Sequence, residues 1–344
     1  MTLVLLGMPI VSALFCWLVI RLGVEDAPDG GRKTQAAPVP TSGGIAIFAT
    51  VAFGLGLTGD LISIYSTELA ALPIFILLAV IIGIYDDIKG MESKRKLLLL
   101  GAISLLAAAF GPRLGYFHLP FGPGAGYPLP VWFSVLGVGL WLFVVINATN
   151  FMDGANGLAM GSAAIMLVSF AILLKLLDIT DPDTDDEAIM SHLAALAAAA
   201  ILGFLVWNMA GKLFAGDTGA LGMGALLGAA GLMVACRLTV WEPVILILPF
   251  LVDVFLTLIW RARAGKHLFE AHRDHAYQLF LRAGWPHWKV SALWVGMTFA
   301  CGAGLLVLGP VTGARIIFIL LALGIGLWVW QRRTLGRQLD AEGR

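Results

Sequence analysis

The sequence contains few charged residues. Of its 344 residues, 13% are charged and 59% are hydrophobic. A soluble domain has about 25% charged and about 45–50% apolar residues. A water-soluble core cannot absorb this surplus of apolar side chains, so the composition excludes an ordinary soluble protein. It indicates that the lipid bilayer surrounds most of the chain.

Cysteine is also scarce. Cys16, Cys236 and Cys301 lie far apart, each in or beside an apolar run. This spacing fits neither a disulfide framework nor a cysteine metal site, so we interpret them as small buried residues. The N-terminal apolar stretch lacks a preceding basic segment and is followed by many more apolar runs. We therefore interpret it as the first membrane span rather than a signal peptide.

Long apolar runs dominate what is present. A spanning helix needs about 20 mostly apolar residues, and eleven windows approach that length. No soluble domain interrupts them. The sequence predicts an all-α polytopic membrane protein with about 10–11 transmembrane helices, forming a single domain over residues 1–344. The windows are 2–22, 43–59, 69–85, 97–111, 131–147, 158–177, 190–209, 219–236, 242–260, 290–308 and 313–330.

The distribution of basic residues predicts the orientation. With eleven spans, one set of loops holds 18 of the 22 lysines and arginines. Loops rich in lysine and arginine face the cytoplasm, so the N-terminus is predicted outside and the C-terminus inside. The other side holds only Arg113, Lys175, Arg237 and Arg315.

Polar residues collect at the predicted cytoplasmic ends of the spans, first at Asp86 and Asp87. Adjacent carboxylates repel each other unless a cation or a proton neutralises one of them. A divalent cation or a nearby lysine, such as Lys89 or Lys96, would do so. The alternative is an ordinary charged helix end that follows the positive-inside rule.

A second cluster spans residues 147–158. At helical spacing Asn147, Asn150 and Asp153 lie near one face and offer oxygen ligands to Mg²⁺. Gly154 and Gly157 let a ligand approach the backbone. One alternative is a helix-capping turn. Another is a glycosylation site at Asn147, which would place the loop outside and is disfavoured by the charge count.

A third cluster leads from Trp207 to Gly219. Asp217, flanked by glycine at a helix start, is either an N-cap or part of a metal–phosphate site, because helix N-termini attract anions. The neighbouring aromatic Phe214 is suited to stacking on a base.

A fourth cluster lies in the largest predicted cytoplasmic loop, where His272, Arg273 and His275 suit a diphosphate or sugar hydroxyls. A zinc site is the weaker alternative, because no cysteine is near. Asp253 lies inside the ninth span. An unpaired charge there is costly, which predicts a functional role in substrate binding.

All four clusters share one predicted side of the membrane, which fits a phosphorylated nucleotide that meets a lipid. A transporter or flippase for a lipid-linked or nucleotide-linked sugar is the alternative from another class. It would require charged residues through the middle of the spans, and no such line is present.

These motifs, from Pro40-Thr-Ser-Gly-Gly44 to the HRDHAYQ segment, resemble the polyprenyl-phosphate N-acetylhexosamine-1-phosphate transferase superfamily in order and over nearly the whole chain. The resemblance implies ten or eleven spans and a cytoplasm-facing active-site cleft. It implies that Asp86 and Asp87 are the catalytic aspartate pair near the lipid phosphate and that Lys96 grips the diphosphate. It further implies that Asn150 and the catalytic Asp217 hold Mg²⁺, with Mn²⁺ as the alternative ion.

Further residues match donor-binding positions of that family. Their implied contacts are with the nucleotide, the uracil ring, and the phosphates and sugar. These residues are Asp153, Asn156 and Gly157 of the NxxDGxxGL motif, Phe214, and His272, Arg273 and His275 of the final loop.

The resemblance implies transfer of N-acetylhexosamine-1-phosphate from a UDP-sugar to undecaprenyl phosphate, with release of UMP. The enzyme would be multi-pass in the bacterial inner membrane, with no nucleic-acid partner and a homodimer as its expected assembly. The EAHRDHAYQ loop is most similar to the branch that initiates O-antigen and related polysaccharides. The alternative within the family is phospho-MurNAc-pentapeptide transferase.

Overall fold

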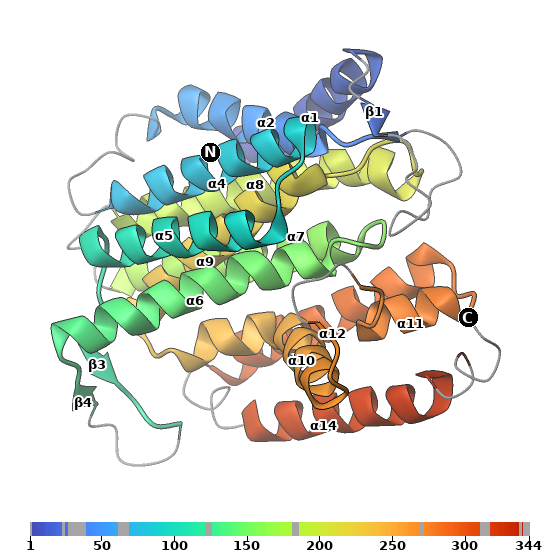
Figure 1. Ribbon diagram of the computed structural model, residues 1–344. Helices are drawn as coiled ribbons and strands as arrows, with labels where there is room; N and C mark the ends of the chain where they lie inside the picture. The colour runs from blue at the N-terminus through green and yellow to red at the C-terminus, as the bar shows by residue number, and fades with distance from the viewer. Residues whose placement is uncertain are drawn as a thin grey trace.

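The computed structural model is a bundle of long helices with two short hairpins at opposite ends (Figure 1). The structure describes residues 2–22, 25–26, 39–60, 69–120, 126–180, 186–267, 272–309, 317–336 and 339. Strand β1 (Glu25–Asp26) pairs antiparallel with β2 (Val39–Pro40). At the other end β3 (Tyr116–Phe117) pairs antiparallel with β4 (Tyr127–Pro128).

The helices follow the predicted apolar windows, and each window falls on one of them. They are α1 (Thr2–Leu22), α2 (Gly43–Thr58), α4 (Ala71–Lys89), α5 (Ser93–Phe110), α6 (Val131–Met152), α7 (Leu158–Thr180), α8 (Asp186–Met209), α9 (Gly216–Arg237), α10 (Trp241–Arg263), α12 (His287–Leu308) and α14 (Ile317–Gln331). Two shorter elements, α11 (Ala276–Arg282) and the π-helix η1 (Arg332–Gly336), were not predicted.

Nine helices in the described part of the chain are long and apolar enough to cross a membrane. This confirms the prediction of an all-α polytopic membrane protein. The remaining two long helices are weaker candidates for different reasons. Helix α2 has only 16 residues, and α5 begins with the charged sequence Ser-Lys-Arg-Lys.

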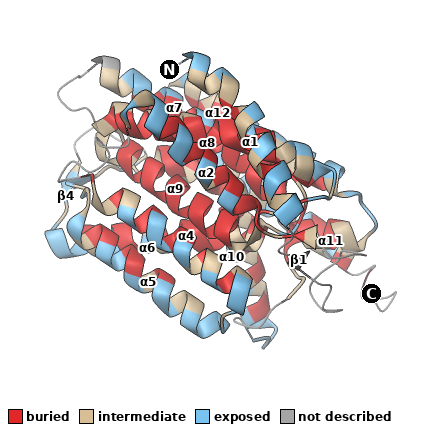
Figure 2. Cartoon of the chain, turned by 90° about the horizontal axis from the view of Figure 1, so that it is seen from above, coloured by how far each residue is buried: buried red, intermediate tan, exposed pale blue. Residues whose placement is uncertain are grey.

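Helix α9 forms the centre of the bundle. In its most apolar window 89% of the residues are buried, against 17% in α1 and 11% in α14. Figure 2 shows α9 as an almost wholly buried helix surrounded by the others. Its sequence is rich in glycine and alanine. Small residues let neighbouring backbones approach closely, which is how helices associate in lipid without a hydrophobic driving force.

Two glycines on neighbouring helices allow the first turn of α9 to pack closely. A Cβ atom on Gly83 of α4 would lie 2.5 Å from Thr218 Cα and 2.6 Å from the Asp217 carbonyl oxygen. A Cβ atom on Gly44 of α2 would overlap the backbone of Gly219. The N-terminus of α9 is therefore held between α2 and α4 by contacts that only glycine permits.

We predict that Gly83→Ala destabilises the protein by about 1–3 kcal/mol, the usual cost of overpacking a core. The added methyl group has to displace the backbone of α9, which cannot rotate away as a side chain can. Thermal unfolding of the detergent-purified protein measures the effect. Gly137→Ala on α6 is the matched control, because a Cβ there meets nothing within 4 Å. Equal unfolding temperatures for Gly83→Ala and the wild type would contradict this packing.

Candidate active site

Four polar side chains from four helices meet at one end of the bundle. Lys96 Nζ lies 2.5 Å from Asp86 Oδ2 and 2.9 Å from Asp217 Oδ1. Asn150 Nδ2 donates to the same Asp217 oxygen at 2.6 Å. The structure thus brings together two carboxylates, an ammonium and an amide that are up to 131 residues apart in sequence.

Helix ends place these groups together. Asp86 lies in the last turn of α4, which ends where Gly90 adopts a φ of 68° and its N–H donates to the Asp86 carbonyl oxygen. Lys96 lies in the first turn of α5 and Asn150 in the last turn of α6. Asp217 lies in the first turn of α9, whose Gly216 has a φ of 69°. Each charged group can therefore sit at a span end rather than in its middle.

Asp87 caps α9. Its Oδ1 accepts the Asp217 N–H at 2.8 Å, and its Oδ2 accepts the Thr218 N–H at 2.9 Å and the Thr218 hydroxyl at 2.6 Å. These N–H groups are among those that a helix N-terminus leaves without an intrahelical partner. The geometry gives Asp87 a positioning role toward Asp217, and its expected contact with a lipid phosphate stays a prediction.

The Lys96 ammonium is held between two carboxylates. Burial alone would lower the pKa of this group, but the charges and hydrogen bonds of Asp217 and Asp86 outweigh it and raise the pKa above its ordinary value. Lys96 therefore stays protonated at neutral pH. It supplies the positive charge that the neighbouring carboxylates of Asp86 and Asp217 need.

The predicted common face of Asn147, Asn150 and Asp153 holds only in part. Asn147 is buried, and its amide donates to the Phe143 carbonyl oxygen of its own helix at 2.7 Å. Helix α6 ends at Met152, and Asp153 leaves the helical conformation with φ −89° and ψ 53°. Of the three, Asn150 donates a hydrogen bond to Asp217, and the chain leaves the helix before Asp153.

The turn after α6 is fixed by hydrogen bonds to two other helices, α8 and α12. The Asn156 N–H donates to His287 Nδ1 at 3.1 Å, and the Asn156 carbonyl accepts the Ser291 hydroxyl at 2.6 Å. The Gly157 N–H donates to Asn208 Oδ1 at 2.7 Å. The backbone of Asn156 and Gly157 is therefore rigid where the motif expects the nucleotide. No pattern in the sequence linked His287 or Ser291 to this turn.

Phe214 lies three residues before Asp217, in the loop between α8 and α9. Its N–H donates to the Pro40 carbonyl oxygen at 2.8 Å, and its own carbonyl accepts the Gly43 N–H at 3.0 Å. The loop therefore joins the start of α2, and the Phe214 ring stays half-buried beside the site. Its predicted stacking on a base is untested.

The final loop packs against the end of α6 through aromatic rings. His275 stacks with Phe151 at a centroid distance of 5.9 Å and with Tyr277 at 6.1 Å, and His272 lies 4.9 Å from His275. The Tyr277 hydroxyl donates to the Phe151 carbonyl oxygen at 3.0 Å. These contacts join the histidines to the helix that carries Asn150. His272 and Arg273 are half-buried, whereas His275 is buried.

Asp253 has a different role from the one its sequence position suggested. Its side chain is 2% exposed, and its Oδ1 accepts the Ala276 N–H at 2.7 Å. Its Oδ2 accepts the Tyr277 N–H at 3.3 Å. Asp253 therefore binds the N-terminus of α11, which the apolar pattern did not reveal. The high cost of its charge is offset by backbone partners within the protein, so a substrate is not needed to explain it.

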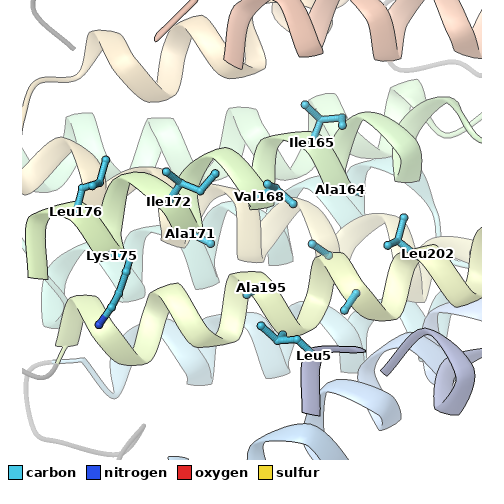
Figure 3. A pocket seen from close by; sticks show the side chains of 12 residues that line it. Leu5, Ala164, Ile165, Val168, Ala171, Ile172, Lys175, Leu176, Ala195 and Leu202 are labelled. Atoms are coloured by element: carbon cyan, nitrogen blue, oxygen red, sulfur yellow. The ribbon is translucent and has the colours of Figure 1, made fainter. Parts of the chain in front are cut away.

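Two cavities lie outside the group around Asp217. One, of about 500 Å³, runs between α7 and α8 and is lined almost wholly by apolar side chains, with Lys175 at one end (Figure 3). Another, of about 220 Å³, lies between α10, α12 and α14 beside Asp253 and Ala276. Neither is lined by Asp86, Lys96 or Asp217.

The chemistry of the site suits a cation that phosphates help to hold. Mg²⁺ is bound in proteins through one or two carboxylates, with phosphates and water completing its shell. The Asp217 carboxylate and the amide oxygen of Asn150, whose nitrogen donates to Asp217, would supply oxygen ligands of that kind. Within the described residues no group of three or more histidine, cysteine, aspartate or glutamate side chains could enclose a metal.

The chain is similar to proteins of a known family. The model of glycosyl transferase family 4 matches residues 69–235, the segment that carries Asp86 through Asp217. The phospho-N-acetylmuramoyl-pentapeptide-transferase of Synechococcus sp. (strain RCC307) is 31% identical over 332 residues, which cover 87% of this chain and 86% of that protein. The chain belongs to glycosyl transferase family 4.

Other relatives of this family 4 transferase carry different names. A Bacillus subtilis (strain 168) protein, described as a probable undecaprenyl-phosphate N-acetylglucosaminyl 1-phosphate transferase, is 27% identical over 335 residues, 92% of this chain and 87% of its own. The decaprenyl-phosphate N-acetylglucosaminephosphotransferase of Mycolicibacterium smegmatis (strain ATCC 700084 / mc(2)155) is 26% identical over 336 residues, 90% of this chain and 82% of its own. The chain is thus a membrane enzyme of the family 4 phosphotransferase type, which confirms the predicted family.

We predict that Thr218→Val destabilises this family 4 transferase by about 1.5–3 kcal/mol, the range for a buried hydrogen bond to a charged group. Valine keeps the shape but leaves the Asp87 carboxylate with two donors instead of three. Thermal unfolding measures the loss. Thr58→Val is the control, because its hydroxyl bonds only carbonyl oxygens of its own helix, both at 3.3 Å. A Thr218→Val protein no less stable than Thr58→Val would remove Asp87 from the role of cap.

Proposed function

We propose that this enzyme transfers N-acetylhexosamine-1-phosphate from a UDP-sugar to undecaprenyl phosphate. The observation that carries the proposal is the convergence of Asp86, Lys96, Asn150 and Asp217 at one end of the bundle. Such a group of acids, amide and lysine is suited to a diphosphate and a cation, and it lies where helix ends give a lipid headgroup access. The names of the relatives support the substrate classes.

The proposed reaction is a displacement at phosphorus. An oxygen of the lipid phosphate forms a bond to the β-phosphorus of the UDP-sugar. The bond between the β-phosphorus and the bridging oxygen breaks, and its electron pair leaves with UMP. The products are UMP and a polyprenyl diphosphate sugar, and the sugar C1–O bond is not cut. The enzyme mainly has to position these groups and balance their charge.

Different residues of the site position the reacting groups and balance their charge. Lys96 places a permanent positive charge beside Asp217, where it neutralises charge on the phosphates. Asp86 holds Lys96 from the other side. Asp87 fixes the first turn of α9 and thereby the direction of Asp217. A phosphate monoester has a second pKa of about 6, so most of the lipid phosphate is already deprotonated at neutral pH. The reaction therefore needs little help from a general base.

Mg²⁺ is the proposed cofactor, with Asp217 and Asn150 as the residues that would hold it. When bound, the ion would neutralise charge that develops on the leaving phosphate. Mn²⁺ has the same oxygen preference and is the alternative ion.

The final loop and the distribution of basic residues support two further parts of the proposal, the pathway and the side of the membrane. The segment Glu270-Ala-His272-Arg273-Asp274-His275 favours the branch of the family that initiates O-antigen-like surface polysaccharides. The excess of lysine and arginine at the ends that carry the site supports a cytoplasmic site and an outside N-terminus. A phospho-MurNAc-pentapeptide substrate is the second candidate, because one relative at 31% identity carries that name.

We predict that the purified protein releases UMP from UDP-N-acetylglucosamine when undecaprenyl phosphate and Mg²⁺ are present. Chelation with EDTA should stop turnover, and added Mg²⁺ should restore it. A competition assay with UDP-MurNAc-pentapeptide separates the two candidate donors. Absence of UMP release with every UDP-N-acetyl sugar, from protein that still unfolds cooperatively, would refute the proposed function.

Asp217→Asn should lower kcat by about 100-fold or more, because the site loses the charge that both Lys96 and the cation require. Lys96→Gln should lower it to a similar extent. Asp178→Asn is the matched control, since this aspartate forms an exposed pair with Lys175 on α7. Near-normal turnover of Asp217→Asn would remove Asp217 from the proposed metal site.

A further inference from the structure

The C-terminal helix α14 buries a polar residue against the final loop. In α14, only Ile317 and Gln331 are buried, and the rest of the helix is half-buried or exposed. Gln331 is 2% exposed although it is polar. Its side-chain amide donates to the Ala276 carbonyl oxygen at the start of α11. Helix α14 contributes little to the core, yet the last residue of the helix is buried and forms a hydrogen bond to the start of α11.

The next residue makes a second contact. Arg332 Nη1 donates to the Asp274 carbonyl oxygen at 3.2 Å, and its guanidinium carbon lies 3.4 Å from the centre of the Trp260 ring. Arginine stacks on aromatic faces and binds carbonyl oxygens at the same time, which lysine does less well. Arg332 thus connects α10 and the loop through one side chain.

The loop is held from α10 as well. Arg261 forms an ion pair with the Asp274 carboxylate, and Arg261 Nη2 donates to the His267 carbonyl oxygen at 2.5 Å. Asp253 binds the N–H groups of Ala276 and Tyr277. Residues 272–275 therefore lie between partners on α10 and partners at the end of α14, and the α14 partners bind backbone carbonyls rather than side chains.

We propose that Gln331 and Arg332 are positioning residues for the donor sugar-nucleotide. They fix the backbone at Asp274 and Ala276 and thereby the direction of His272 and Arg273, and they have no role toward the lipid phosphate. This proposal rests on the proposed function and on the donor contacts that the family resemblance implies for His272 and Arg273. It assigns a role to a helix that lies beyond residues 69–235, the part matched by the family model.

The first test measures the loop itself and does not depend on activity. Hydrogen–deuterium exchange of the full-length protein in detergent should show faster exchange across residues 274–280 in Gln331→Leu and in Arg332→Leu. Arg333→Leu is the matched control, because Arg333 is the exposed neighbour in η1. Unchanged exchange in both variants would overturn the proposal, whether or not the enzyme transfers sugar phosphate.

The second test measures the donor. Each variant should raise the KM for the UDP-sugar by about 3- to 10-fold, the effect of one or two lost hydrogen bonds, and leave the KM for undecaprenyl phosphate within about 2-fold. Arg332→Lys should recover part of the donor KM. Equal changes in both KM values, or faster exchange with an unchanged donor KM, would overturn the proposal. A wild type without UMP release would instead refute the proposed function, and the exchange data would still decide the loop contact.

Discussion

The contact between the Asp87 carboxylate and the first turn of α9 determines where the rest of the site lies. Asp87 lies in the last turn of α4, and its carboxylate accepts the N–H groups of Asp217 and Thr218, about 130 residues later in the chain. Because the partners are backbone atoms, the contact fixes the helix itself. The position of this first turn holds the Asp217 side chain within hydrogen-bonding distance of Lys96 and Asn150. Glycines on α2 and α4 permit the close approach that the contact requires.

Electrostatics explains why these groups lie at span ends and in mutual contact. A lone charge in an apolar environment is costly, and a pair is tolerated when hydrogen bonds satisfy both partners. Here Asp86, Lys96 and Asp217 form a chain of alternating charge, and Asn150 donates one further hydrogen bond to Asp217. A diphosphate and a divalent cation would bring equal and opposite charges into such a chain. The site can therefore accept substrate without a large change in its net charge.

The sequence predicted the fold well because the bilayer makes each span visible as an apolar run. It also predicted that Asp86, Lys96, Asn150 and Asp217 share one side of the membrane, because each lies at a span end on the side rich in lysine and arginine. Their mutual contacts come from the structure. The sequence did not predict which acids bind the protein's own backbone. Asp87 and Asp253 look like substrate ligands in the sequence, yet both accept backbone N–H groups of a distant helix. Their partners depend on tertiary packing, which leaves no local pattern.

Two helix caps of the same kind build the two halves of the site. Asp87 fixes α9 and with it Asp217, whereas Asp253 fixes α11 and with it the segment that holds His272 and His275. The halves meet at the end of α6, where Asn150 reaches toward Asp217 and Phe151 stacks on His275. Under the proposed function, a donor that spans both halves would meet the acid–lysine group on one side and the histidines of the final loop on the other. Because separate helices fix the two halves, the loop on α11 can differ between relatives in sequence while the acid–lysine group keeps its geometry.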